Sequence, residues 1–218
     1  MRARLVLANI LAVAACALVY ELMLGTLASY ALGDAVREYS ITIGLYLAAM
    51  GLGAFVSGKI GERVAEWYVR AELLLAIAGG ASVPLLFAFA SAAPTGGGLA
   101  LRALVYLAVV VLGALVGLEL PLLVRISKAD GSFADVVSRA LAFDYAGALV
   151  ASLAFPLVLV PRLGLARASL ATGAVNALSA LSATWILAPS LGERRIGLRA
   201  ASAAAFVGLV VGCVHTHG

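Results

Sequence analysis

The chain consists mainly of long, continuous runs of apolar residues, separated by short segments that carry most of the charges. A helix needs about 20 apolar residues to cross the hydrocarbon core of a bilayer, whereas transmembrane barrel strands alternate over about 10 residues. The unbroken runs therefore predict an all-α, polytopic transmembrane helix bundle that forms a single transmembrane domain over residues 1–218. We expect about seven membrane-spanning helices, at residues 5–32, 40–58, 72–92, 102–123, 137–160, 168–188 and 198–214.

The composition narrows the class of protein further. Of the 218 residues, 64% are hydrophobic and only 12% are charged, and the mean hydropathy is +1.09. Soluble domains are about 25% charged. These values exclude an ordinary soluble enzyme, a disordered protein and a nucleic-acid-binding domain. We therefore expect the lipid bilayer as a partner and no nucleic acid.

The charges between the predicted spans give the chain an orientation. Of the 15 Lys and Arg residues, only Arg37, Arg102, Arg162 and Arg167 fall on one side of the predicted membrane. The side with the excess of basic loops faces the cytoplasm. We expect a cytoplasmic N-terminus in a prokaryotic cytoplasmic membrane.

Three acidic residues lie inside predicted spans: Glu21, Glu119 and Asp144. An ionisable side chain there costs about 2.5–3.5 kcal/mol on insertion scales and often marks a functional site. One interpretation is a binding site for a cation or proton, with Tyr20, Tyr30 and Tyr46 as possible partners of Glu21. The other is structural pairing of Glu119 and Asp144 with basic residues near the cytoplasmic interface. Those basic residues are Lys59, Arg125, Lys128 and Arg139.

Uncharged residues inside the spans suggest helix contacts. Asn176 lies near the middle of its span, where it can join two helices by hydrogen bonds or bind a ligand. Small residues permit close approach of helix backbones. We expect such packing within the chain, with a homodimer surface as the alternative, at Gly51, Gly53, Gly58, Gly113, Gly117, Gly208 and Gly212.

The end of the chain offers a weak metal-binding pattern. Cys213, His215 and His217 carry ligand atoms that bind zinc or copper. A solvated terminus is the explanation that we favour for three such residues in an unstructured tail. We therefore predict no metal and no cofactor, and with both histidines terminal we expect no imidazole-based catalysis.

Several motifs carry a resemblance to a known family. They are ALVYELMLGTLASYALG in the first span, GLGAFVSGKIGERV after the second, LVGLELPLLVRI in the fourth and AFDYAGALVASLAFPLVLVPRLGL in the fifth. Over about residues 10–190 the chain resembles the membrane region of the fused major-facilitator/spermidine synthase family. The resemblance implies a multi-helix membrane domain followed by a soluble aminopropyltransferase domain that binds decarboxylated S-adenosylmethionine and a polyamine.

The 218 residues lack the pattern of that soluble domain. It requires a strand, a glycine-rich turn and acidic residues, whereas the triple glycine at residues 96–98 follows a Pro-Thr turn between two spans. We therefore expect that the chain is not an enzyme by itself.

Three functions stay open. The first is a non-catalytic membrane module that binds a polyamine-like cation or a partner protein, such as a separate soluble aminopropyltransferase. The second is a small dimeric, proton-coupled transporter of polyamine-like or other cations. The third is a structural subunit among other membrane subunits.

Overall fold

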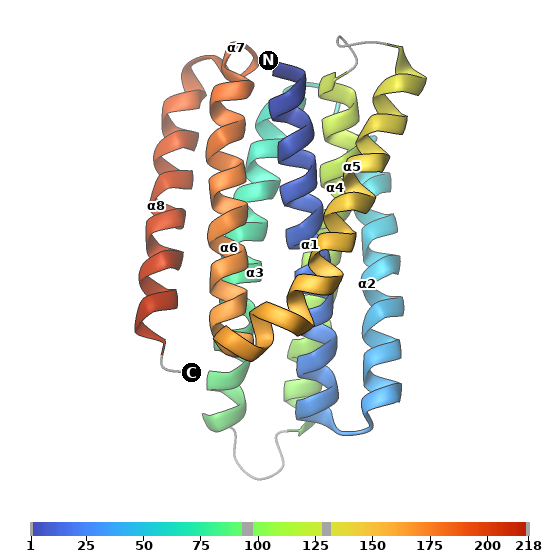
Figure 1. The fold of residues 1–218 in the computed structure, drawn as a ribbon, viewed down its shortest axis with the longest axis vertical. Coiled ribbons are helices and arrows are strands. Elements are labelled where there is room, and N and C mark those ends of the chain that lie inside the picture. Colours follow the sequence, from blue (N-terminus) through green and yellow to red (C-terminus); the bar gives the residue numbers. More distant parts are fainter. Residues whose placement is uncertain (1, 93–97, 128–131, 217–218) are drawn as a thin grey trace.

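The computed structural model describes residues 2–92, 98–127 and 132–216. These residues are helical almost throughout, and this part of the chain contains no β-strand. The helices form one elongated bundle, with the two termini near opposite ends (Figure 1). The prediction of an all-α fold is confirmed.

Ten helical elements follow one another along the described chain, and two helix starts are capped. Asp34 accepts a hydrogen bond from the Arg37 backbone N–H, and Ser132 accepts one from the Asp135 N–H. Such caps satisfy N–H groups that have no partner within the helix. The elements are α1 (Arg2–Leu32), α2 (Ala35–Ser57), α3 (Val64–Ala92), α4 (Gly98–Ile126), α5 (Phe133–Ala154), the π-helix η2 (Phe155–Leu159), α6 (Val160–Ile186), α7 (Ala188–Leu191), the 3-10 helix η3 (Gly192–Arg194) and α8 (Arg195–His215).

Six helices are long and apolar enough to cross a membrane, whereas the sequence pattern predicted seven. The count differs because the predicted spans 137–160 and 168–188 belong to one continuous helical stretch, Phe133–Ile186. This stretch runs along the bundle as α5 and returns as α6 (Figure 1). The predicted loop between them is therefore largely helical, and the chain reverses direction through helical turns that are interrupted at Gly164.

The reversal between α5 and α6 has two local causes. Pro156 has no backbone N–H and cannot continue the regular hydrogen bonding, and the chain widens into the π-helix η2 at this point. Gly164 then adopts φ 70° and ψ 171°, a conformation that is essentially restricted to glycine. Pro121, by contrast, does not end its helix, since α4 continues to Ile126.

The third helix begins at Val64, eight residues before the predicted start at residue 72. The apolar pattern missed this part because it contains charged residues. Glu66 is buried and accepts hydrogen bonds of 2.8 and 2.6 Å from Arg194, and the Arg70 Nη2 lies 2.6 Å from the Glu66 Oε1. These ion pairs neutralise Glu66 and permit a charged first turn at the end of the bundle.

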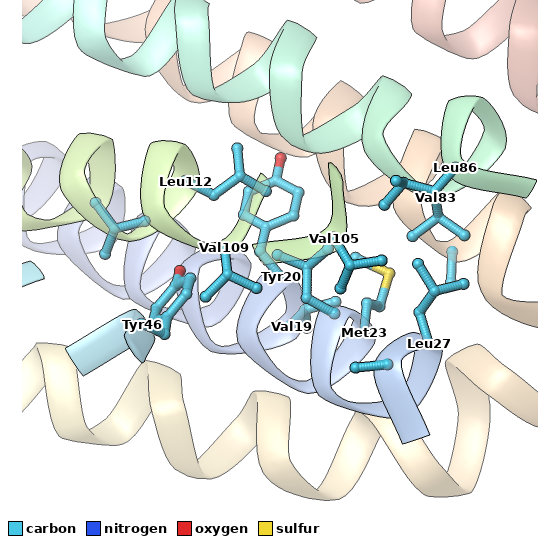
Figure 2. Packing of buried hydrophobic residues seen from close by; sticks show 14 of the residues in the cluster. Val19, Tyr20, Met23, Leu27, Tyr46, Val83, Leu86, Val105, Val109 and Leu112 are labelled. Carbon is cyan, nitrogen blue, oxygen red and sulfur yellow. The ribbon is translucent and has the colours of Figure 1, made fainter. Parts of the chain in front are cut away.

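The first helix lies in the middle of the bundle and contacts α2, α4, α5 and α6 (Figure 1). On the side toward α3 and α4 its apolar residues form the main core (Figure 2). Further helix pairs are α2 with α4, α3 with α6, and α6 with α8. The core residues drawn and labelled in Figure 2 are Val19, Tyr20, Met23, Leu27, Tyr46, Val83, Leu86, Val105, Val109 and Leu112.

Glycines bring α2 and α4 into direct backbone contact. A Cβ added at Gly53 would collide with the carbonyl group of Ala114, and one at Gly117 with the backbone of Met50. At Gly113 it would meet the carbonyl oxygen of Tyr46. Three of the predicted packing glycines therefore lie at this contact, which is internal to the chain.

The other four predicted packing glycines differ from this pattern. A Cβ at Gly51 or Gly208 would meet open space, and one at Gly58 only the nearby Phe55 carbonyl oxygen. At Gly212 it would make ordinary contact with the Leu170 side chain at 3.5 Å. The motif Gly208-x-x-x-Gly212 thus does not mark a close helix crossing, since small residues permit such a contact without requiring it.

We expect Gly117→Ala to destabilise the chain by about 1–3 kcal/mol, because the added methyl group overlaps the Met50 backbone and forces α2 away from α4. Thermal unfolding in lipid nanodiscs measures the change. Gly208→Ala is the matched control, since its Cβ enters open space and alanine favours the helix. Equal unfolding temperatures for the two variants would contradict the close α2–α4 contact.

Candidate functional site

A cavity of about 440 Å³ lies among α1, α2, α4 and α5. All three acidic residues that the sequence singled out line it, Glu21 from α1, Glu119 from α4 and Asp144 from α5. Glu21 and Asp144 are half-buried, whereas Glu119 is only 3% exposed. The fold thus gathers three carboxyl groups from distant parts of the sequence around one space. Their role as a ligand or proton site stays a prediction.

Close helix contacts frame the cavity on two sides. Gly53 and Gly117 hold α2 against α4, and Gly147 holds α5 against α1, since a Cβ there would collide with the Leu11 carbonyl oxygen. Between these two helix pairs the walls carry small side chains that leave the volume unfilled. Those small wall residues are Ala14, Ala17, Gly51, Ala54, Gly117 and Ala148.

The three cavity carboxylates have no cationic partner within the described chain. The ion pairs of this part join Glu66 to Arg70 and Arg194, and Glu38 to Arg102. The described residues therefore do not show the structural pairing that was the alternative for Glu119 and Asp144.

The basic residues considered for that pairing make other contacts. Arg125 donates hydrogen bonds to the carbonyl oxygens of Ser57 and Gly61, at 2.9 and 3.4 Å. The Lys59 ammonium lies 4.9 Å from the centre of the Phe55 ring. Arg139 belongs to a separate small pocket, and Lys128 lies outside the described residues.

Tyr20 and Asn176 lie in the bundle interior and do not line the cavity. Tyr20 extends from α1 toward α3, with its hydroxyl group away from α1 (Figure 2). A Cβ at Gly79 of α3 would collide with its ring, so this glycine provides the space for the tyrosine. Tyr20 therefore does not lie beside Glu21 on the cavity wall, contrary to the expectation from the sequence.

Asn176 on α6 is a hydrogen-bonding partner of Glu72 on α3. Its Nδ2 donates to the Glu72 backbone carbonyl at 3.0 Å and to the Glu72 Oε2 at 2.9 Å. Both side chains are fully buried. The contact fits the structural interpretation of Asn176, in which a polar residue joins two helices.

Glu72 is a buried acidic residue that the sequence interpretation did not include. It was taken as the boundary of the third span, because the uninterrupted apolar run begins after it. A signal was present in the helical period, since Tyr68, Glu72, Leu75 and Gly79 recur on one face and are all buried. An acid in that register indicates a buried position, not a helix end.

The weak metal-binding candidates of the tail make other contacts where the structure describes them. Cys213 donates to the Arg167 carbonyl oxygen at 3.7 Å, and His215 Nδ1 lies 2.9 Å from the Val211 carbonyl of its own helix. The third candidate, His217, lies outside the described residues. Within that description no group of three His, Cys, Asp or Glu side chains is arranged for a metal ion.

Sequence similarity identifies relatives of this chain. Polyamine aminopropyltransferase 2 of Ralstonia nicotianae is 45% identical over 195 residues, which cover 87% of this chain and 37% of that protein. The chain is similar to polyamine aminopropyltransferases. The enzyme of that name from Leptospira interrogans is 38% identical, covering 94% of this chain and 40% of its own length. The one from Mycobacterium tuberculosis is 35% identical, and the match covers 97% of this chain and 41% of that protein.

These relatives correct one expectation and limit another. The expectation that the chain is not an enzyme is wrong, because proteins named as aminopropyltransferases match most of it at 35–45% identity. Their names support the spermidine synthase side of the resemblance and do not mention a major-facilitator domain. The chain spans only 37–41% of the length of these three relatives. No family model matches the chain, and no solved structure matches it significantly.

We expect Asn176→Ala to destabilise the chain by about 1–2 kcal/mol, because Glu72 loses a hydrogen-bond donor while its side chain is fully buried. Thermal unfolding in nanodiscs measures the effect. Ser152→Ala is the control, since Ser152 is exposed and bonds only the Leu149 carbonyl of its own helix. An Asn176 variant as stable as this control would show that the α3–α6 contact does not depend on the hydrogen bonds.

Proposed function

We propose that the chain is the membrane-spanning part of a polyamine aminopropyltransferase and that its cavity binds a polyamine. The proposal draws on the names of the relatives and on the six helices that are long and apolar enough to cross a membrane. The aminopropyl transfer itself is proposed for the protein as a whole. We also propose that its N-terminus faces the cytoplasm, since the basic residues concentrate on that side.

The observation that carries the proposal is the meeting of Glu21, Glu119 and Asp144 at one cavity without a described cationic partner. A polyamine is a flexible chain of methylene groups interrupted by positively charged amines. The cavity offers matching chemistry, since its other walls are mainly aliphatic and its charged groups are all acidic. Its 440 Å³ fall within the range of about 300–1,000 Å³ typical of small-molecule sites.

The three carboxylates differ in burial, and this difference gives them different roles in binding an amine. Glu21 and Asp144 are partly exposed and can pair with an incoming ammonium group before it loses its water. Glu119 is almost fully buried. An ammonium group that reaches it exchanges its own hydrating water for a charge-assisted hydrogen bond to the carboxylate. The site therefore draws in a cationic amine and holds one end of it deep between α1 and α4.

We expect Glu21→Gln and Asp144→Asn each to weaken spermidine binding about tenfold or more, because each removes one charge-assisted hydrogen bond. Isothermal titration of the chain in lipid nanodiscs measures the affinity. Glu62→Gln, an exposed acid between α2 and α3, is the control and should bind as the unaltered chain does. Undiminished binding by both cavity variants would refute the assignment.

Filling the cavity provides a test that does not alter charge. Gly51 lines the cavity and has open space around its Cβ position, so Gly51→Leu should fold normally and occupy the space meant for the methylene chain. We expect this variant to lose spermidine binding while its unfolding temperature changes little. Gly44→Leu is the control, since Gly44 is on the same helix, is exposed and lies outside the cavity. Strong binding by Gly51→Leu would place the polyamine elsewhere.

A further inference from the structure

A group of buried polar atoms lies beside the cavity, in the centre of the bundle. Four of them have no hydrogen-bond partner in the described structure: Tyr20 Oη on α1, Glu72 Oε1 on α3, Glu119 Oε1 on α4 and Asn176 Oδ1 on α6. All four side chains are at most 3% exposed. Buried polar atoms are nearly always hydrogen-bonded, so four orphaned atoms from four helices require an explanation.

The four residues lie close enough to affect one another. Glu119 is within electrostatic reach of Glu72 and Asp144, and Tyr20 is within reach of both glutamates. Asn176 is tied to Glu72 by hydrogen bonds that use both hydrogens of its Nδ2. The group is therefore one cluster around a pair of buried glutamates.

The hydrogen-bonding capacity of the cluster is unbalanced. Of the four unpartnered atoms, two are carboxyl oxygens and one is an amide oxygen, all of which accept, while only the Tyr20 hydroxyl donates. No described ion pair supplies a positive charge to Glu72 or Glu119. One bound proton compensates for both the excess of acceptors and the missing positive charge, because it neutralises a carboxylate and turns an acceptor oxygen into a donor.

The other titratable groups around the pair do not supply that proton. Tyr46 donates its hydroxyl hydrogen to the Ala17 carbonyl at 3.0 Å, and Tyr68 donates to Asn9 Oδ1 at 2.6 Å. Asp144 is itself acidic. The titratable groups within electrostatic reach of one or both glutamates are Cys16 and Tyr20 from α1, Tyr46 from α2, Tyr68 from α3 and Asp144 from α5. Among the described residues, α6 contributes the neutral Asn176 to the cluster.

We infer that Glu72 and Glu119 form a carboxyl pair that holds a proton when the cavity is empty and releases it when a cationic amine binds. This inference rests on the proposed function, because it requires polyamine binding in the cavity. The physical link is Glu119, which lines the cavity and belongs to the pair. An ammonium group at Glu119 favours its ionised form. The carboxyl O–H bond then breaks, its electron pair stays on the oxygen, and the proton leaves through the cavity to the buffer.

Calorimetry in two buffers tests the release. The chain in nanodiscs is titrated with spermidine at neutral pH, in buffers of equal pH but different enthalpies of ionisation. The difference between the two heats gives the number of protons released. We expect about one proton per bound spermidine, because a single like-charged pair shares it. Binding without proton release would overturn the inference and leave the proposed function intact.

Glu72→Gln tests the carboxyl pair without altering the cavity wall, since Glu72 does not line the cavity. Glutamine imitates the neutral carboxyl group and removes the like charge beside Glu119. We expect spermidine still to bind, while proton release falls close to zero. Glu62→Gln is the control and should keep full release. Unchanged release in Glu72→Gln would overturn the role of the pair.

Infrared spectroscopy of the unaltered chain provides a measurement that does not depend on a variant. A protonated, buried carboxyl group has a carbonyl stretching band distinct from that of a carboxylate. We expect this band in the ligand-free chain and its loss on addition of spermidine. If spermidine gives no binding heat, the proposed function fails and proton release on binding fails with it. The band then decides whether the pair holds a proton, and its absence overturns that part too.

Discussion

Neutralising acidic side chains inside an apolar bundle is the constraint on which the rest of this structure depends. A charged side chain in the middle of a membrane costs several kcal/mol unless another group compensates for it. Near the starts of α2 and α3 that group is arginine, since Glu38 pairs with Arg102 and Glu66 with Arg70 and Arg194. Deeper in the bundle, Glu72 and Glu119 have no such partner among the described residues. Glu38 and Glu66 thus connect helices through ion pairs, whereas Glu72 and Glu119 lack a compensating positive charge in the described chain.

The backbone contacts between helices determine where the cavity lies, and therefore where a positive charge can approach these acids. Gly53 and Gly117 bring α2 onto α4, and Gly147 brings α5 onto α1, so these two pairs are fixed by backbone geometry. Larger side chains in the space between them would close the cavity, but the sequence places alanine and glycine there. The same class of residue therefore has opposite effects, giving tight packing where a second backbone faces it and a cavity where none does.

The sequence predicted the fold class and the three cavity acids better than the boundaries and partners. Apolar runs locate helices because backbone groups in hydrocarbon must be satisfied within the helix. They fail where a buried charge is compensated by a distant residue, as Arg194 does for Glu66, so α3 was predicted eight residues too short. The helical turn at Pro156 and Gly164 was missed for a similar reason, since hydropathy does not distinguish a loop from a helix that folds back. The pairing of Asn176 with Glu72 depends on the tertiary packing of α3 and α6 and has no counterpart in a single sequence.

The position of Glu119 connects the cavity to the bundle interior. It lies on the cavity wall and is within electrostatic reach of Glu72, which is joined through Asn176 to α6. Any charge that enters the cavity at Glu119 therefore changes the electrostatic environment of a contact between two helices that do not line the cavity. Since Glu72 and Glu119 are buried, the effect is screened far less than it would be at a surface. In such an arrangement ligand binding and the α3–α6 contact are linked through one carboxyl group, without requiring a large movement of any helix.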